Sequence, residues 1–332
     1  MMNFQMTVSF SSSSITYGKR AKIGVIVPPT NTVNEVEWNL MAPDGVSVHS
    51  TRMPLHADTT SDKGRKALYE DIKQATRYLA PARLSAIAYG CTAGSMVLPL
   101  TKLTNFMENL AEAPCVTTAA SIVMALRALK ILKVALATPY HDELNQHEVD
   151  FLKKVGVAVK HEQGLGIGAN GPQEYIKLAQ PPQKKIFEHI LSTDCDEAEA
   201  MVVSCSDFPV LGMIPELEKR TGKPVITSNQ ATFWAALRAS GRSLESLTCT
   251  PHAPIPSATV ALFVGWNSDA ILWPSGWWSL TMPSVLLLNT TQIIGRSYWT
   301  AVEIALTTIC LLYTSDAADE RSSVDLGGRR II

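Results

Sequence analysis

Residues 22–31 read KIGVIVPPTN. A short apolar, β-branched run that ends in a turn is typical of a buried parallel strand, and ligands bind at the carboxyl ends of such strands. Residues 63–80 then place apolar side chains at helical spacing, and residues 84–90 (LSAIAYG) predict the next buried strand. This part of the chain therefore predicts a β-α-β unit with a polar loop after its first strand.

The same alternation continues through the middle of the chain. Residues 114–140 predict a strand, a helix and another strand, and residues 141–156 predict an amphipathic helix that a glycine ends. Residues 196–208 (DEAEAMVVSCSDF) predict a strand that ends on a cysteine, and residues 212–241 predict a helix, a strand and a last helix. Strands that alternate with helices in this way predict an α/β fold with mostly parallel sheets.

An internal repeat divides the predicted fold into two. The run KIGVIVP at residues 22–28 aligns with KVALATP at residues 133–139, and nearly the same offset aligns the strands that precede Cys91 and Cys205. We therefore expect two similar, doubly wound parallel-sheet lobes, related by a pseudo-twofold, with the active site in the cleft between them. The first lobe would comprise residues 21–118 and 222–245, and the second would comprise residues 119–221. The alternative is that α/β strands resemble one another by composition alone.

Composition limits the partners. The 332 residues carry a formal net charge of −1, which predicts no basic face for nucleic acid or an anionic membrane and leaves a small molecule as the expected partner. Six cysteines are too sparse for a disulfide scaffold, and their spacing does not suit zinc. We therefore expect reduced thiols, a cytoplasmic protein and no metal.

Both ends of the chain differ from the middle. Residues 1–20 are Ser-rich and are interpreted as a disordered leader. Residues 246–309 have no regular period and are interpreted as a tail that does not belong to the fold. A membrane anchor there is disfavoured, because prolines interrupt the apolar stretch. Residues 310–332 look like translated sequencing-adapter sequence.

Two cysteines occupy matching turns. Cys91 lies in YGCTAGS (residues 89–95) and Cys205 lies in SCSDF (residues 204–208), each beside a small hydroxyl residue, Thr92 or Ser206, that we expect to bind substrate. A turn of this kind at a helix start is expected to lower the pKa of a thiol and to bind an anion. Two thiols on opposite sides of a substrate can act as acid and base, or one can add to an alkene. The alternative is that both cysteines only pack in the core.

Other polar loops supply candidate ligands for carboxylates. Asn31 lies between two threonines after the first strand, Tyr140 follows the strand that starts the second lobe, and Asn170 lies in a Gly-rich loop. The sequence pairs neither His56 nor His141 with a carboxylate, so both are expected at the surface.

Residues 22–241 resemble the aspartate/glutamate racemase superfamily, and within it the branch of maleate cis-trans isomerase and arylmalonate decarboxylase. The motifs that carry the resemblance are VPPTNT, YGCTAGSM, ATPY, VVSCSDFP and TGKPVITSNQATFWAAL, in the order of the family. The resemblance implies that Cys91 is the nucleophile, that Cys205 is its partner acid or base, and that Asn31, Tyr140 and Asn170 bind substrate carboxylates.

The resemblance also ranks the possible functions. It implies a homodimer without cofactors that acts on a small carboxylate, and maleate isomerisation by addition of a thiolate to the alkene is the leading expectation. A racemase is the next alternative. An arylmalonate-type decarboxylase is disfavoured, because such enzymes carry glycine in place of the first cysteine. A carboxylate-binding module without catalysis remains a fourth alternative.

Overall fold

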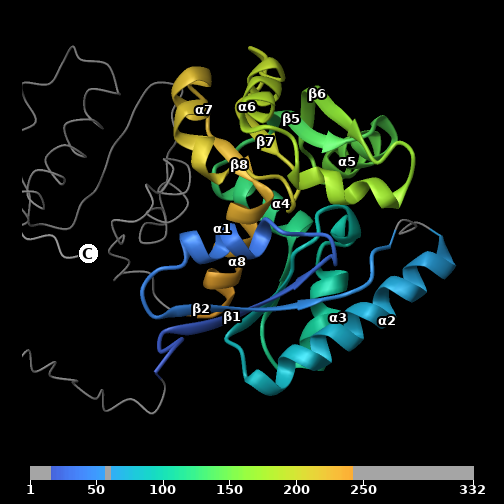
Figure 1. Cartoon of the computed structure of the whole chain (residues 1–332), viewed down its shortest axis with the longest axis vertical. Helices are drawn as coiled ribbons and strands as arrows, with labels where there is room; N and C mark the ends of the chain where they lie inside the picture. Colours follow the sequence, from blue (N-terminus) through green and yellow to red (C-terminus); the bar gives the residue numbers. More distant parts are fainter. Residues whose placement is uncertain (1–15, 57–60, 242–332) are drawn as a thin grey trace, which may run out of the picture. The chain divides into compact units, whose positions relative to one another are not determined.

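The computed structural model describes residues 16–56 and 61–241, which contain two four-stranded parallel sheets (Figure 1). The first sheet has the order β2-β1-β3-β4, and its strands are β1 (Ala21–Val27), β2 (Val46–Arg52), β3 (Ala86–Tyr89) and β4 (Cys115–Thr117). The second has the order β6-β5-β7-β8, with β5 (Lys133–Tyr140), β6 (Ala158–Ile167), β7 (Ala200–Val203) and β8 (Val225–Thr227). The α/β class and the two similar parallel-sheet lobes are therefore confirmed, and the shared strand order agrees with the repeat in the sequence.

Helices connect the parallel strands. The α-helices are α1 (Asn34–Met41), α2 (Asp62–Leu79), α3 (Thr101–Ala111), α4 (Thr118–Ala128), α5 (Asp142–Lys154), α6 (Gln183–Ser192), α7 (Ile214–Thr221) and α8 (Ser228–Ala239). The 3-10 helices are η1 (Ala80–Ala82), η2 (Ala93–Ser95), η3 (Pro172–Ala179) and η4 (Leu211–Met213). None of the described helices is long and apolar enough to cross a bilayer.

The central strands are the most apolar because both of their faces are covered. Every residue of β3 and β7 is buried, whereas the edge strands β2 and β6 are largely half-exposed. Helix α2 covers one face of the first sheet with an apolar stripe that includes Leu68 and Ile72. Its start is fixed by Ser61, whose hydroxyl accepts a hydrogen bond from the backbone of Gly64 at 3.0 Å.

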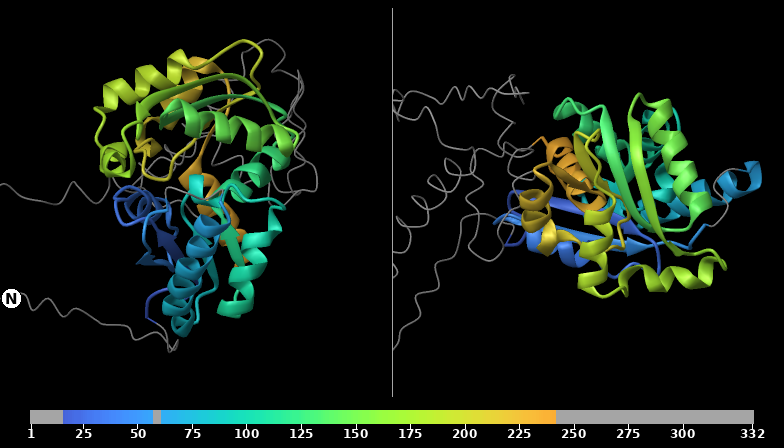
Figure 2. Two further views of the ribbon diagram at one scale, coloured as in Figure 1. Left: turned by 90° about the vertical axis from the view of Figure 1, so that its right-hand side faces the viewer. Right: turned by 90° about the horizontal axis from the view of Figure 1, so that it is seen from above.

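Helices α4 and α8 join the two lobes. They pack against each other, and the apolar cluster around them contains residues of both sheets, such as Val25 and Leu136. In the same cluster, Trp38 of α1 packs against Phe233 of α8 with ring centroids 5.0 Å apart and the ring planes tilted by 45°. The two lobes therefore share one core, and Figure 2 shows α8 running from one lobe to the other.

Two of the expected boundaries differ from the structure. Strand β8 pairs with β7 in the second sheet, so the chain returns to the first lobe after β8 and not at residue 222. Helix α8 then packs on β3 and β4 of the first sheet. At the other end, the backbone N of Arg20 donates to the carbonyl of Gly45 at 2.9 Å, so the fold begins before residue 21. The remainder of the expected leader and the interpretations for residues 246–309 and 310–332 lie outside the described residues.

Candidate active site

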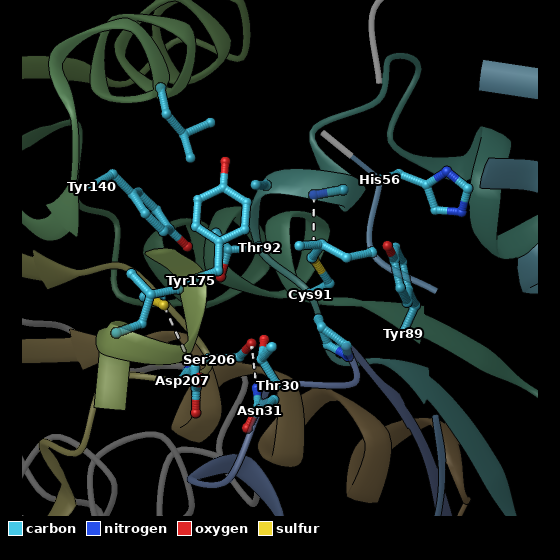
Figure 3. A pocket seen from close by; sticks show the side chains of 17 residues that line it. Thr30, Asn31, His56, Tyr89, Cys91, Thr92, Tyr140, Tyr175, Ser206 and Asp207 are labelled. Carbon is cyan, nitrogen blue, oxygen red and sulfur yellow. Dashed lines mark hydrogen bonds between the residues drawn. The ribbon is translucent and has the colours of Figure 1, made fainter. Parts of the chain in front are cut away.

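A cleft with about 680 Å³ of empty space, part of it open to solvent, lies at the carboxyl ends of β1, β3, β5 and β7 (Figure 3). This is where parallel sheets present their loops. The cleft is lined by Pro28, Thr30, Asn31, Leu55, His56, Tyr89, Cys91, Thr92, Ala93, Gly94, Tyr140, Leu144, Tyr175, Leu178, Cys205, Ser206 and Asp207.

The structure brings both thiols to this cleft. Cys91 follows β3 and is half-buried, while Cys205 follows β7 and is buried. The strands β3 and β7 hold the same position in their sheets, and the loops that follow them meet at the same cleft. The spatial expectation from the sequence, that the two sulfurs share one pocket, therefore agrees with the structure.

Each thiol has a backbone N–H as a hydrogen-bond donor and a tyrosine phenol nearby. The phenol of Tyr89 is close enough to lower the pKa of Cys91, and the phenol of Tyr140 is close enough to lower that of Cys205. The backbone N of Gly94 lies 3.4 Å from Sγ of Cys91, and the backbone N of Asp207 lies 3.3 Å from Sγ of Cys205. In Figure 3, Tyr89 with Cys91 and Tyr140 with Tyr175 lie on opposite sides of the cleft. These donors would stabilise a thiolate once it forms.

The expectation that the turns lower the thiol pKa values is wrong. Burial raises the pKa of Cys91 and outweighs the opposing effects of Gly94 and Tyr89. Burial also raises the pKa of Cys205, and the negative charge of Asp207 raises it further. The physical reason is desolvation, because burial of the sulfur penalises its charged form more than a few N–H and O–H dipoles compensate.

A chain of polar side chains joins the loops of the two lobes. Nδ2 of Asn31 donates to Oγ of Ser206 at 3.1 Å, and this hydroxyl donates in turn to the carbonyl of Gly90 at 2.8 Å. On the other side of Cys91, the hydroxyl of Thr92 hydrogen-bonds to that of Ser228 at 2.9 Å. Asn31, Thr92, Tyr140 and Ser206 all line the cleft. Their role in substrate binding stays a prediction.

Asn170 is the one predicted site residue that the structure does not bring to the cleft. Its side chain is exposed, and its Nδ2 donates to Oε1 of Glu174 at 3.1 Å. The following helix η3 does reach the cleft, through Tyr175 and Leu178. A role for Asn170 in substrate binding stays a prediction.

His56 is not the unpaired surface residue that we expected. Its Nε2 lies 2.8 Å from Oδ2 of Asp71 on α2, the side chain is only 12% exposed, and the residue lines the cleft. The packing of α2 brings Asp71 close to His56. Nothing in the sequence near His56 indicates this pairing, because Asp71 lies 15 residues further along the chain. His141, by contrast, is half-exposed before α5 and is not among the lining residues.

Sequence reasoning also missed Tyr89, Tyr175 and Asp207. Tyr89 and Asp207 lie within two residues of the cysteines, inside the motifs YGCTAGS and SCSDF, so the cysteine motifs were the signal for both positions. No Lys or Arg is among the lining residues of this cleft. The described residues also contain no group of three or more His, Cys, Asp or Glu side chains that could hold a metal ion.

These features define an α/β protein of two similar lobes with a thiol from each lobe at the intervening cleft. The chain belongs to the arylmalonate decarboxylase family, whose sequence profile matches residues 23–249. This confirms the branch of the aspartate/glutamate racemase superfamily that the motifs indicated.

Individual relatives cover the same part of the chain. The maleate isomerase of Geobacillus stearothermophilus is 26% identical over 254 residues, which are 71% of this chain and 96% of the relative. The arylmalonate decarboxylase of Bordetella bronchiseptica is 28% identical over 222 residues, which are 66% of this chain and 90% of the relative.

A solved structure agrees with these sequence relatives. It is a cysteine-to-serine variant of the Nocardia farcinica maleate cis-trans isomerase with a covalently bound succinylcysteine intermediate. This structure is 25% identical with a TM-score of 0.61, and the match covers 70% of this chain and 96% of that one.

Proposed function

We propose that this enzyme is a cis-trans isomerase of a small unsaturated dicarboxylate, with maleate as the substrate and fumarate as the product. The observation that carries the proposal is that Cys91 and Cys205 line one cleft, each with a tyrosine phenol at its sulfur. The similarity to maleate isomerases, one of them with a succinylcysteine intermediate, supports the same chemistry.

The reaction needs only the two thiols. The thiolate of Cys91 adds to one alkene carbon, and the π electrons move toward the other carbon, which takes the proton of the Cys205 thiol. The resulting succinyl thioether has a single bond in place of the double bond, so it can rotate. Cys205, now a thiolate, removes a proton from the same carbon, the C–S bond breaks, and the electron pair restores the alkene in its trans form with Cys91 as the leaving thiolate.

The polar residues of the cleft would hold the two carboxylates. Thr92, Tyr140 and Ser206 bring hydroxyl groups to the lining, and Asn31 fixes Ser206. Asn170 would have to leave Glu174 to take part. A set of neutral donors suits a reaction in which negative charge moves between sulfur, carbon and carboxylate, because hydrogen bonds can stabilise each form.

The arylmalonate decarboxylase relative favours a second candidate, the decarboxylation of a disubstituted malonate. The presence of Cys91 speaks against it, because decarboxylases of this branch carry glycine at that position and use the second cysteine alone. The two candidates differ in their need for Cys91, so one variant separates them.

The test is to incubate the full chain with maleate and to follow fumarate by the NMR signal of its vinyl protons. We expect fumarate from the parent, and at least about a hundredfold loss of kcat in Cys91→Ser and in Cys205→Ser. Cys195→Ser is the matched control, because Cys195 is a half-buried thiol outside the lining. Activity in Cys91→Ser would contradict the addition mechanism.

The same preparation tests the other candidates. Carbon dioxide release from arylmalonates that survives Cys91→Ser would favour the decarboxylase. Exchange of the α-hydrogen of chiral aspartate in deuterated water would favour a racemase, and saturable binding of maleate without turnover would favour a binding module.

We further propose that the enzyme needs no metal or organic cofactor, that it is a homodimer and that it is cytoplasmic. The reaction as written uses only side-chain thiols, and the four cysteines of the described residues are free. Full activity after exhaustive dialysis against EDTA, and a mass of two chains by light scattering, are the expected results.

A further inference from the structure

Asp207 contacts both the second thiol and the opposite lobe. Its backbone N donates to Sγ of Cys205 at 3.3 Å, and its Oδ1 accepts a hydrogen bond from the backbone N of Thr32 at 2.8 Å. The residue is only 4% exposed and is part of the cleft lining. The carboxyl group is therefore held at a fixed place beside Cys205.

The charge of the Asp207 carboxyl group is only partly compensated by its neighbours. Its second oxygen, Oδ2, is buried and has no hydrogen-bond partner in the described part of the chain. Arg52 is near enough to act on Asp207 electrostatically, but its guanidinium forms an ion pair with Glu35 and donates to the carbonyl of Asn31 at 2.7 Å. Burial raises the pKa of Asp207 more than the backbone N–H groups of Thr32 and Val33 and the charge of Arg52 lower it, and an ionised Asp207 in turn raises the pKa of its neighbour Cys205.

We propose that Asp207 is a positioning residue of the isomerisation, and that its buried carboxylate keeps Cys205 in the thiol form and so makes it the proton donor. This leaves Cys91, the more exposed thiol, as the nucleophile. The inference rests on the proposed function and adds a reason why two similar cysteines take different parts in it.

The pH range in which Asp207 is ionised fits its proposed role. Burial raises the pKa of Asp207 to about 7, so the carboxyl group is already ionised at pH values below those at which the two buried thiols lose their protons. The negative charge of Asp207 is therefore present in the pH range in which Cys205 has to stay protonated. Below about pH 7 Asp207 is protonated and the difference between the thiols is smaller.

Other ionisable groups also lie around Asp207 and Cys205. Glu37 of α1 accepts hydrogen bonds from the backbone of Val210 and Leu211 at 2.9 Å each and is thereby directed at the chain beyond Asp207. Among the described residues, further ionisable groups at or beside the cleft include Cys91, Tyr89, Tyr140, Tyr175, the His56–Asp71 pair, the Arg52–Glu35 pair, Glu143 and Glu148. Among these, burial raises the pKa of both Tyr140 and Tyr175, so these phenols stay neutral over the same range.

The test measures the reactivity of Cys205 directly. Full-length protein with the background change Cys91→Ser is treated with iodoacetamide, a neutral reagent, at pH values from about 6 to about 9.5, and labelling of Cys205 is followed by peptide mass spectrometry. The comparison is between Asp207 and Asp207→Asn, which keeps an oxygen for Thr32 but removes the charge. We expect similar rates at about pH 6, and at least about tenfold faster labelling of the Asn variant at about pH 9.

Two controls define the outcome. Asp196→Asn removes an exposed carboxylate of the same lobe and should leave the rates unchanged, while Asp207→Glu should keep the slow labelling. If the Asn variant is insoluble, Asp207→Ser removes the charge in the same way. The decisive quantity is the labelling rate of Cys205 in Asp207→Asn divided by the rate in the parent. A ratio above one that is the same at all pH values would indicate loosened packing and would overturn the proposal. A ratio of one would overturn it as well.

Activity provides an independent measurement. With maleate as substrate, the alkaline limb of kcat should move to lower pH in Asp207→Asn, because Cys205 then loses its proton earlier. Because the labelling experiment does not use turnover, an inactive parent would contradict the proposed function while the labelling still decides the role of Asp207.

Discussion

Asn31 donates a hydrogen bond from its Nδ2 to Oγ of Ser206 at 3.1 Å, although 175 residues separate the two in the sequence. Oδ1 of Asn31 meanwhile accepts from the backbone N of Val33 at 3.1 Å and of Asn34 at 3.0 Å, which fixes the loop before α1. One buried amide therefore holds the first-lobe loop in shape and attaches it to the loop of the second cysteine.

Replacing Asn31 by alanine should affect both stability and activity. The change leaves Ser206 without its donor and two backbone N–H groups without their acceptor, so we expect a loss of about 2 kcal/mol in the free energy of unfolding and a lower kcat. Urea denaturation and the fumarate assay measure the two effects. Asn39→Ala on the exposed face of α1 is the control, and an equal loss in both variants would argue against the loop role.

Gly94 should be needed to keep the phenol of Tyr89 beside Cys91. A Cβ at this position would lie 2.3 Å from the phenol oxygen of Tyr89 and 3.3 Å from Sγ of Cys91, so Gly94→Ala has to displace the phenol. We expect at least about a tenfold loss of kcat, similar to that of Tyr89→Phe. Gly212→Ala is the control, because a Cβ there would meet nothing within 4 Å, and full activity of Gly94→Ala would contradict the role of Tyr89.

Glu148 should make folding stability fall as pH rises. Burial raises its pKa from 4.5 to about 7, so the unfolded chain releases this proton at lower pH than the folded protein does. Stability is therefore lost between pH 4.5 and about 7, and Glu148→Gln removes this loss. We expect the variant to gain roughly 2–3 kcal/mol relative to the parent between these pH values, measured by urea denaturation. Glu197→Gln, an exposed carboxylate, should gain almost nothing.

The activity on maleate should rise with pH above neutrality. The proposed nucleophile is the thiolate of Cys91, and burial raises the pKa of this thiol from its ordinary value of 9.0. The reactive form therefore becomes more abundant as pH increases, and we expect kcat/KM to grow continuously from about pH 7 to about pH 9. A kcat/KM that is constant over this range would contradict a buried thiol as the nucleophile.

The sequence predicted the buried strands better than the half-exposed ones, since the buried edge strands β4 and β8 were expected as well. Strands β1, β3, β5 and β7 are continuous apolar runs because helices cover both of their faces, and all four were expected. The edge strands β2 and β6 were not, because their polar, largely half-exposed residues give no clear alternation. The sequence also did not predict the short helix α1 or the helix α3.

The sequence by itself determined the α/β class, the repeat, the family and the two cysteine loops, because these depend on local apolar runs and short motifs. Only the tertiary structure decided the protonation of the thiols, since desolvation depends on everything that encloses Cys91 and Cys205. It also decided that His56 pairs with Asp71, that Asp207 reaches Thr32, and that Asn170 lies outside the cleft. These relationships join residues from different elements, and only packing determines their distances.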